Sequence, residues 1–427
     1  MSRFHTLAEW LAWQEQLHPR SIDLGLERVT AVARTLDLLQ PACPVITVAG
    51  TNGKGSSVAM LESVYRSAGY RTGAYTSPHL LRYNERIRID GHEVADDALC
   101  AAFARVDQAR GDISLTYFEF GTLAALLLFR QAAPDLLILE VGMGGRLDAV
   151  NAIAADVALV TAIGIDHSAW LGADRAAIAR EKAGILRAGR PAVCSDPAPP
   201  ASLLAHAADL GVRCLCLGQA FSHRRHGDGW DWTGWYSRLE RLPLPALSGT
   251  HQLDNAAGVL AVTELLGSRL PVGRAAIEAG LSTVRLAGRF QIVPGSPQLI
   301  LDVAHNPDGA AMLAGQLREN PVAGRTWLVL GILADKDAAG FVRALEGIVD
   351  CWCLAGLADS RGLDADALTQ RLAEPGRARA LQRYGSVADA LAAAQAAAAD
   401  SDRIVVTGSF HTVAAALAGP LSLPPDR

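Results

Sequence analysis

The sequence predicts an α/β protein of two domains, each built on a parallel sheet with helices on both faces. Short apolar segments alternate with helical patterns along most of the chain, which is typical of doubly wound sheets. The length of 427 residues, 50% of them hydrophobic, allows about two or three domains. Gly, Pro and Ser gather at residues 282–297. We therefore expect an N-terminal domain of residues 1–284 and a smaller C-terminal domain of residues 285–427.

The elements of the N-terminal part follow from its apolar runs. Strands are predicted at residues 45–48, 71–75, 136–139, 157–165 and 191–194, and a buried, Ala- and Leu-rich helix at residues 117–131. Residues 221–247 differ, because the aromatic and turn-rich stretch HRRHGDGWDWTGWY predicts a β-hairpin. The helical pattern resumes at Asn255.

The C-terminal part repeats the alternation and predicts a Rossmann-like α/β domain. Helical stretches separate predicted strands at residues 299–303, 326–331, 351–354 and 403–406. The alanine-rich segment 387–399 is the clearest of these helices. The last residues, SLPPDR, are expected to fray.

The segment VITVAGTNGKGSS at residues 45–57 is the most informative motif. A buried strand leads into a glycine-rich turn with one lysine, and an amphipathic helix follows. Glycines let backbone N–H groups approach phosphate oxygens, the helix N-terminus adds a positive dipole, and the lysine adds a charge. The N-terminal sheet is thus predicted to be of the P-loop ATPase type. The nucleoside triphosphate would bind at Thr51, Asn52, Gly53, Lys54, Gly55 and Ser56.

The loop departs from the common pattern G-x-x-x-x-G-K-[ST]. That pattern would put a glycine at Val48 and a magnesium-binding hydroxyl at Gly55. A metal ion therefore needs other ligands. Ser77, just beyond the strand predicted at residues 71–75, can supply the missing hydroxyl.

Polar residues follow two other predicted strands, at the sheet edge where ligands bind in open parallel sheets. Glu140 comes directly after an apolar run and precedes a glycine turn, a position suited to a magnesium-binding or water-positioning carboxylate. The alternative for Glu140 is a salt bridge at the edge of the sheet. Asp166 and His167 follow the strand predicted at residues 157–165, and the alternative for His167 is a structural hydrogen bond.

The composition and charge of the chain bear on its binding partners and on its location in the cell. The net charge of −5 gives no reason to expect nucleic acid or an anionic membrane. The N-terminus has no signal-peptide core, and no apolar run approaches the length of a spanning helix. The seven cysteines include two C-x-C pairs, Cys214/Cys216 and Cys351/Cys353, which are expected to be buried reduced thiols. We expect a cytoplasmic protein and, without a long heptad pattern, a monomer.

Eight motifs together resemble the folylpolyglutamate synthases, a family of the Mur ligase superfamily of ATP-dependent amide ligases. They occur in the family's order over nearly the whole chain: GTNGKGS (50–56), TSPHL (76–80), LEVGMGGRLDAVN (139–151), DHSAWLG (166–172), REKAGI (180–185), GRFQ (288–291), DVAHNP (302–307) and GSFHT (408–412). The chain most resembles the bacterial members that are both dihydrofolate synthase and folylpolyglutamate synthase.

The resemblance implies an acyl-phosphate mechanism in which ATP is a co-substrate and L-glutamate is added to a folate or pteroate carboxylate. It also implies one or two Mg²⁺ ions. Ser77 and Glu140 resemble ligands of the first ion and His167 a ligand of the second. Asn255, Arg289 and Asp302 resemble residues that contact the nucleotide in the family.

Lys54, His167 and Lys182 are the residues to which the resemblance gives a catalytic role. Lys182 is commonly N6-carboxylated by CO₂ in the family, which turns a cation into a carbamate that can approach the metal site. Only the neutral amine reacts, so the pKa of this lysine would have to be lowered. The plainer interpretation of Lys182 is a surface lysine on a helix.

Three further segments resemble the pterin-binding parts of the two-activity enzymes. They comprise Ile22, Asp23, Leu24 and Gly25, then Thr116, Tyr117, Phe118 and Glu119, and then Leu147, Asp148 and Ala149. Phe118 can stack on a pterin and Asp148 can pair with its amino-pyrimidine edge. The alternatives are that Phe118 begins a core helix and that Asp148 caps a turn. Without this pocket, the chain would extend folates only.

Two other classes remain open from the sequence. A cell-wall Mur ligase would need a further N-terminal domain for its UDP-sugar, and only 44 residues precede the first predicted strand. A non-catalytic nucleotide switch would need neither Glu140, His167 and Lys182 together nor a second domain. His305 and His411 lie in motifs of the family but have no role from sequence, although His305 can help to place glutamate or cap a helix.

Overall fold

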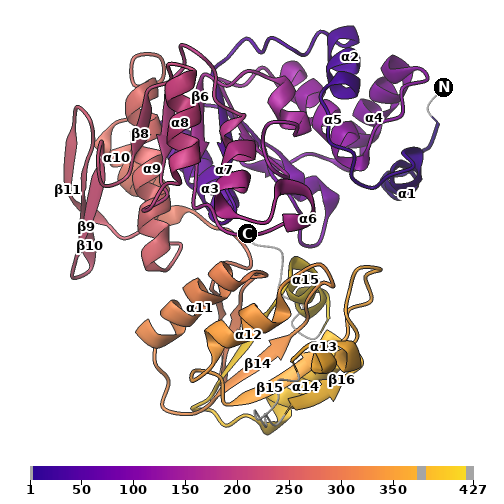
Figure 1. The fold of residues 1–427 in the computed structure, drawn as a ribbon, viewed down its shortest axis with the longest axis vertical. Helices are drawn as coiled ribbons and strands as arrows, with labels where there is room; N and C mark the ends of the chain where they lie inside the picture. Colours follow the sequence, from indigo (N-terminus) through magenta and orange to yellow (C-terminus); the bar gives the residue numbers. More distant parts are fainter. Residues whose placement is uncertain (1–2, 373–380, 420–427) are drawn as a thin grey trace.

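The computed structural model describes residues 3–372 and 381–419. Two separate sheets lie in two lobes, with the N-terminal sheet in the upper lobe of Figure 1 and the C-terminal sheet in the lower, orange-to-yellow lobe. This confirms the predicted α/β class. The expected boundary after residue 284 falls between α10 (Arg274–Thr283) and β12 (Gln291–Val293), and it stays a prediction.

The N-terminal sheet has, within the described residues, the strand order β4-β3-β2-β5-β1-β6-β7-β8. The strands from β2 to β8 in this order are parallel, while β3 and β4 extend one edge in antiparallel directions. Their bounds are β1 Val45–Ala49, β2 Thr72–Tyr75, β3 Ile87–Ile89, β4 His92–Glu93, β5 Leu136–Glu140, β6 Val157–Val160, β7 Ala192–Cys194 and β8 Cys214–Cys216. The central position of β1 and β5 places their carboxyl ends in the middle of the sheet.

Helices cover both faces of this sheet, as the wholly apolar strands predict. Ile46 and Val48 of β1 pack in the cluster that includes α3 and α9, whereas Val45 and Ala49 face clusters on the opposite side. The helices are α1 Leu7–Leu17, α2 Glu27–Thr35, α3 Lys54–Ser67, α4 Asp96–Arg110, α5 Tyr117–Ala132, α6 Ser168–Leu171, α7 Arg175–Ala183, α8 Ala201–Asp209 and α9 Thr250–Leu266, with α10 and the short 3₁₀ helices η1 Tyr83–Arg86 and η2 Ala149–Ala152.

The segment expected to form a β-hairpin forms three antiparallel strands, β9 Ser222–His226, β10 Gly229–Thr233 and β11 Arg238–Pro243. The expected hairpin is present as β9 and β10, and β11 pairs with β10 as a third strand that the sequence did not predict. Trp230 and Trp232 of β10 are fully buried, and the indole N–H of Trp232 donates to the Ala257 carbonyl at 3.2 Å. The small sheet is therefore fastened to α9, at the far left of Figure 1.

Two predicted boundaries were wrong. Strand β6 ends at Val160 instead of residue 165, because Asp196 Oδ2 accepts the Ile163 N–H at 2.8 Å and the chain leaves the sheet as a loop. Helix α9 begins at Thr250 instead of Asn255, because its first turn is polar and hides the apolar period. The other predicted strands and helices agree within two residues at each end.

The C-terminal sheet has the order β12-β13-β17-β14-β15-β16 in the described residues, with only β12 antiparallel to its neighbour. Its further strands are β13 Gln298–Leu301, β14 Thr326–Leu330, β15 Cys351–Ala355, β16 Leu381–Tyr384 and β17 Arg403–Thr407. Side chains alternate between two clusters, one with α11 Pro307–Glu319, α12 Ala338–Leu345 and α13 Ala365–Leu372, the other with α14 Val387–Ala397 and α15 Phe410–Ala418.

Three expectations concern features outside the two sheets. The tail SLPPDR lies outside the described residues. All seven cysteines are free; Cys216 and Cys353 are buried, whereas Cys214 and Cys351 are only half-buried. Among the helices of the described part, none is both long and apolar enough to cross a membrane.

Candidate active site

A cavity of about 420 Å³ lies between the two lobes, at the carboxyl ends of the central strands of the N-terminal sheet. Segments after β1, β2, β5 and β6 supply one wall, and segments after β13, β14 and β17 supply the other. The cavity brings together most of the residues singled out from sequence: Ile22, Asp23, Leu24, Gly25, Thr51, Asn52, Gly53, Lys54, Gly55, Ser56, Ser77, Thr116, Phe118, Glu119, Glu140, Leu147, Asp148, Ala149, His167, Lys182, Arg289 and Asp302.

The glycine-rich loop lies where β1 meets α3. Gly53 has a φ of +91°, a conformation that favours glycine, and α3 starts at Lys54 immediately after it. The Lys54 ammonium folds back over the loop and donates to the carbonyls of Gly50 at 3.0 Å and Thr51 at 3.2 Å. Burial lowers the pKa of Lys54, against the attraction of Glu140. The amides of Thr51 and Asn52 donate to the Ala162 carbonyl, whereas the first amides of α3 have no partner within the helix. A buried cation at such a helix N-terminus is a site for polyphosphate.

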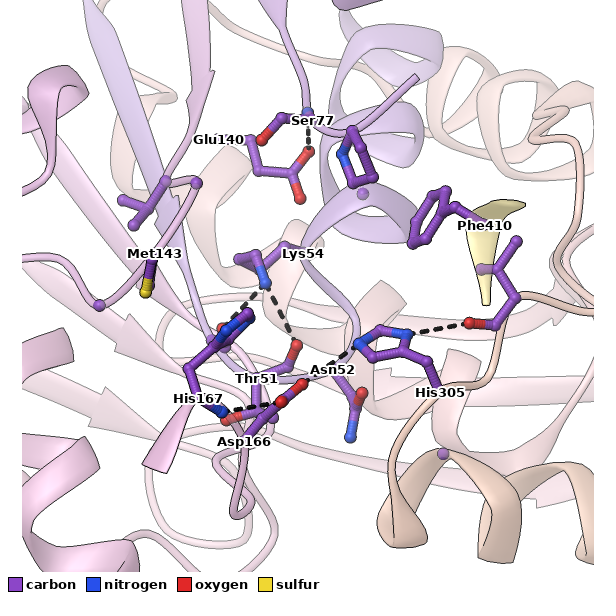
Figure 2. A pocket seen from close by; sticks show the side chains of 18 of the residues that line it. Thr51, Asn52, Lys54, Ser77, Glu140, Met143, Asp166, His167, His305 and Phe410 are labelled. Atoms are coloured by element: carbon purple, nitrogen blue, oxygen red, sulfur yellow. Dashed lines mark hydrogen bonds and ion pairs between the residues drawn. The ribbon is translucent and has the colours of Figure 1, made fainter. Parts of the chain in front are cut away.

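Glu140 and Ser77 lie together at one end of Lys54 (Figure 2). Glu140 ends β5, is 4% exposed, and its Oε2 accepts the Ser77 N–H at 3.2 Å. Burial raises the pKa of Glu140, while Lys54 and Arg289 oppose that rise. Glu140 lines the cavity at the carboxyl end of a central strand, and both its metal-binding role and the alternative of a salt bridge stay predictions.

The donor chemistry at Glu140 and Ser77 fits a hard divalent cation, which prefers carboxylate and hydroxyl oxygens. Among the described residues, no group of three or more His, Cys, Asp or Glu side chains is arranged to hold a metal ion by itself. A cation here would therefore need phosphate oxygens and water to complete its coordination, as is usual for Mg²⁺ bound with a nucleotide.

His167 lies on the other side of Lys54 (Figure 2). Its backbone is left-handed, with a φ of +52°, and its N–H donates to Asp166 Oδ1 at 2.8 Å. Burial lowers the pKa of the His167 ring to about 4, although Asp166 opposes the shift. The neutral imidazole keeps a nitrogen lone pair that can bind a metal ion.

Lys182 is buried on α7 and reaches the same glycine loop. It is 4% exposed, and its ammonium donates to the Gly50 carbonyl at 2.8 Å. The plainer interpretation, a surface lysine, is therefore wrong. Burial, with a smaller contribution from Lys54, lowers the pKa of Lys182 to about 7, so a large fraction of the amine is neutral near neutral pH.

The segments expected to bind a pterin line the same cavity, apart from Tyr117. Asp148 is 3% exposed and accepts the N–H of Met143 at 2.9 Å and that of Val150 at 3.0 Å. It thereby caps η2, as the alternative interpretation predicts, and it also faces the cavity. Burial raises the pKa of Asp148 to about 7, against these backbone hydrogen bonds.

Phe118 and Tyr117 are adjacent on α5 but lie differently. Phe118 lines the cavity and packs 5.8 Å from the Tyr75 ring. Tyr117 is not part of the cavity lining; its ring packs edge-on against Tyr83 at 5.7 Å and beneath the Arg86 guanidinium. Helix geometry explains the difference, because neighbouring residues on a helix point about 100° apart.

The C-terminal lobe contributes Arg289 and Asp302. The Arg289 guanidinium lies 5.1 Å from the Phe410 ring centroid. Asp302 accepts the N–H groups of Phe290 and Ala304, both at 2.8 Å, and burial raises its pKa. Asn255 does not line this cavity; it lines a second cavity that also includes Asn52 and Gly53.

A buried cluster joins the two lobes at Asp166. Its Oδ2 accepts from the His305 ring and the Asn306 amide, each at 3.2 Å, and its Oδ1 accepts from the Lys336 ammonium at 2.6 Å. The side chains of Asp166 and Lys336 are each 7% exposed. Burial would raise the pKa of Asp166, but the hydrogen bond from His305 and the charge of Lys336 hold it well below its usual range.

Lys336 is a site residue that the sequence interpretation missed. It follows β14, so the rule that sites gather beyond strand ends could have found it. His305 acquires a structural role in this cluster. His411 also lines the cavity, with Nδ1 3.7 Å from Asp359 Oδ2.

A family model and several curated relatives resemble this chain. A family model described as Mur ligase, glutamate ligase domain, matches residues 288–410. The dihydrofolate synthase/folylpolyglutamate synthase of Escherichia coli (strain K12) is 48% identical over 408 residues, which cover 96% of this chain and 94% of that protein.

Two solved structures extend the similarity to three dimensions. Escherichia coli FolC in complex with DHPP and ADP has a TM-score of 0.91 at 46% identity, covering 97% of each chain. A bifunctional folylpolyglutamate synthase/dihydrofolate synthase with Mn, AMPPNP and L-glutamate bound has a TM-score of 0.91 at 46% identity, covering 98% of each chain. Those relatives therefore bind nucleotides, and the second also binds a divalent metal.

Proposed function

The chain belongs to the dihydrofolate synthase/folylpolyglutamate synthase family of ATP-dependent ligases, and on that premise we propose that its interdomain cavity joins L-glutamate to 7,8-dihydropteroate and to tetrahydrofolates. One observation carries the proposal. A phosphate loop, a buried carboxylate suited to a divalent cation, and the three segments expected to bind a pterin all line one cavity.

The reaction requires a carboxylate to attack ATP. An acceptor carboxylate oxygen forms a bond to the γ-phosphorus, and ADP leaves. The glutamate amine then attacks the acyl carbon, phosphate leaves with the former carboxylate oxygen, and the amine nitrogen loses its proton. Because carboxylate and triphosphate repel each other, the site must supply cations and hold the groups in line.

The chain's own cations fit this requirement. Lys54 and the backbone amides of residues 53–56 would bind the β- and γ-phosphoryl oxygens from the N-terminal lobe, with Thr51 and Asn52 lining the same loop. Arg289 would approach from the C-terminal lobe, with Asp302 contacting the ribose or base. Asn255, in the neighbouring cavity beside Gly53, would contact the nucleotide from the end of the N-terminal domain.

Mg²⁺ is the cation that we propose for the part of the cavity lined by Ser77, Glu140 and His167. Ser77 and Glu140 would hold one ion and neutral His167 a second. Bound there, divalent cations neutralise the triphosphate and orient the acceptor carboxylate.

Lys182 would carry a carbamate in the active enzyme. Its burial and its pKa of about 7 favour the neutral amine that reacts with CO₂. The product is an anion beside Lys54 and within the region proposed for the metal ions, where positive charge stabilises it.

The acceptor would lie with its pteridine against Phe118 and Asp148 and its carboxylate toward Lys54. The segments 22–25, 116–119 and 147–149 would form the pteridine pocket, with Tyr117 supporting it from outside the lining. The monomeric state and the cytoplasmic location stay predictions.

The test is phosphate release by purified protein with ATP, Mg²⁺ and L-glutamate, using 7,8-dihydropteroate or tetrahydrofolate as acceptor, with products identified by mass. Turnover with both acceptors is the expected result. Turnover with tetrahydrofolate alone would restrict the enzyme to polyglutamylation, and no turnover with either would overturn the proposal.

A further inference from the structure

The first wall of the proposed pteridine pocket is a loop without helix or strand. Residues 21–25 line the cavity between α1 and α2, and backbone hydrogen bonds of a sheet or helix do not hold them. A loop of this kind keeps its shape only if side chains fasten it.

Arg28, in the first turn of α2, makes the largest set of contacts to this loop. Its NH1 donates to Asp23 Oδ2 at 2.6 Å and its NH2 to the Asp23 carbonyl at 2.5 Å. Its Nε donates to both carboxylate oxygens of Glu119, at 3.2 and 3.3 Å. One guanidinium therefore binds the loop to the N-terminus of α5.

The two carboxylates that Arg28 joins belong to different walls of the cavity. Asp23 and Glu119 both line it, whereas Arg28 does not. Glu119 is also fixed from its other side, because its Oε2 accepts the Thr116 N–H at 2.8 Å in the capping box of α5. Arg28 thus sets the position of the loop relative to a rigid helix end.

We propose that Arg28 is a positioning residue for the pteridine acceptor, acting through Asp23 and Glu119. This inference rests on the proposed function, since it assigns the loop to the acceptor. Without the guanidinium, two buried or half-buried carboxylates would repel each other across the pocket, and the loop would move away from α5.

Lysine cannot replace this arrangement. The planar fork of arginine makes four hydrogen bonds in fixed directions to two carboxylates and one carbonyl, whereas an ammonium is a point charge with three rotatable donors. The loop contacts the end of the acceptor remote from the reacting carboxylate. Its displacement is therefore expected to weaken acceptor binding more than it slows the chemical step.

The test compares steady-state constants of the wild-type protein with those of Arg28→Gln and Arg28→Lys, using 7,8-dihydropteroate as the probe. We expect the KM for dihydropteroate to rise about tenfold in Arg28→Gln and less in Arg28→Lys, with the KM for ATP and kcat changed by less than about twofold. Thermal unfolding of each variant checks that it is folded. If Arg28→Gln does not fold, the KM of Arg28→Lys for dihydropteroate decides the test.

Arg20→Gln is the matched control. Arg20 contacts the same aspartate, at 3.4 Å, but its side chain is 74% exposed and it does not line the cavity. We expect its KM values to match those of the wild type.

Two outcomes would overturn the inference alone. One is an unchanged KM for dihydropteroate in folded Arg28 variants, and the other is an equal rise in the KM for ATP, which would indicate a general structural effect. If the wild-type protein forms no product from dihydropteroate, the proposed function fails and this inference fails with it.

Discussion

Lys182 and Asp148 are ionisable side chains on the wall of one cavity, and burial moves the pKa of each to about 7. The pKa of Lys182 is lowered and that of Asp148 is raised from the usual value, because burial disfavours the charged form of both groups. Both side chains therefore titrate in the neutral range, and both give pH-dependent predictions.

The prediction for Lys182 concerns CO₂. Since its pKa is lowered to about 7, the neutral amine predominates above that pH, and carbamate formation should increase as the pH rises through 7. We expect activity to fall in CO₂-depleted buffer and to return with bicarbonate. Lys182→Ala should lose about 10²- to 10³-fold in kcat, with partial recovery on adding acetate, whose carboxylate can occupy the vacated space.

Arg180→Gln is the control for Lys182, because Arg180 lies on the same helix but is exposed. It should leave activity and its response to bicarbonate unchanged. A ¹³C NMR spectrum of fully active, ¹³CO₂-equilibrated enzyme that lacks a carbamate carbon signal would contradict the carbamate.

Asp148 gives the second prediction. If its carboxylate pairs with the amino-pyrimidine edge of the acceptor, the ionised form binds better. Because burial raises its pKa to about 7, the ionised fraction grows between pH 6 and 8. We expect the KM for dihydropteroate to fall as the pH rises through 7, and Asp148→Asn to remove this dependence. An unchanged pH profile in Asp148→Asn would assign the titration to another group.

At the scale of elements, helix α3 has a left-handed glycine beyond each end. Gly53 precedes it with a φ of +91°, and Gly69 follows it with a φ of +89°. A Cβ at Gly53 would lie 2.5 Å from Asn255 Oδ1, whereas one at Gly69 would meet nothing within 4 Å. The two positions share the same backbone strain and differ only in their surroundings.

Substitutions of Gly53 and Gly69 can therefore separate the cost of backbone strain from an effect on nucleotide binding. Gly69→Ala should cost about 1–2 kcal/mol of stability from the left-handed conformation and leave the KM for ATP unchanged. Gly53→Ala should cost a similar amount and also raise the KM for ATP, because its methyl group displaces Asn255 and the phosphate loop. Chemical denaturation and steady-state kinetics measure the two effects, and equal KM values for both variants would exclude a special role of the loop geometry.

The elements also show how much sequence could predict. Wholly apolar runs located the central strands, because a parallel strand buried on both faces has no polar position. The end of β6 was misplaced, since Ile163 and Ile165 are as apolar as the strand. Only Asp196, which comes 33 residues after Ile163 and binds its N–H, takes the chain out of the sheet.

At the scale of the whole molecule, the Asp166 cluster joins the two lobes. Asp166→Ala would leave the Lys336 ammonium buried with Asp335, at 3.8 Å, as its one acidic partner among the described residues. Loss of one partner of a buried ion pair costs about 3–5 kcal/mol. We therefore expect the lobes to separate. Small-angle X-ray scattering of the ligand-free protein should show a larger radius of gyration, independently of any effect of Asp166 on catalysis.

Arg225→Gln is the control for lobe separation. Arg225 of β9 and Glu319 of α11 also pair across the lobes, at 3.8 Å, but both are about half exposed, and such pairs contribute about 0–1 kcal/mol. The radius of gyration of the Arg225→Gln variant should equal that of the wild type. Equal values for Asp166→Ala and the wild type would show that other contacts hold the lobes.

The Asp166 cluster also marks where sequence reasoning stops. The motifs identified Asp166 but not Lys336. The two residues are 170 positions apart and follow strands of different sheets. Their contact depends on how the two lobes pack, which no local pattern encodes. Gly50 and Lys54, four residues apart in one loop, were accessible to such a pattern.

Asp148 follows β5 and Lys54 follows β1, two paired strands of one sheet, so one rigid element sets the distance between the proposed pteridine pocket and the phosphate loop. Each glutamate added moves the reactive carboxylate one residue farther from the pteridine, while the phosphate loop stays where it is. In the proposed pose dihydropteroate reaches from the pteridine pocket to Lys54, whereas a lengthening acceptor would have to bend or withdraw its pteridine from the pocket. We expect catalytic efficiency to decline with chain length, so that the same geometry that favours the first glutamate limits the length of the finished tail.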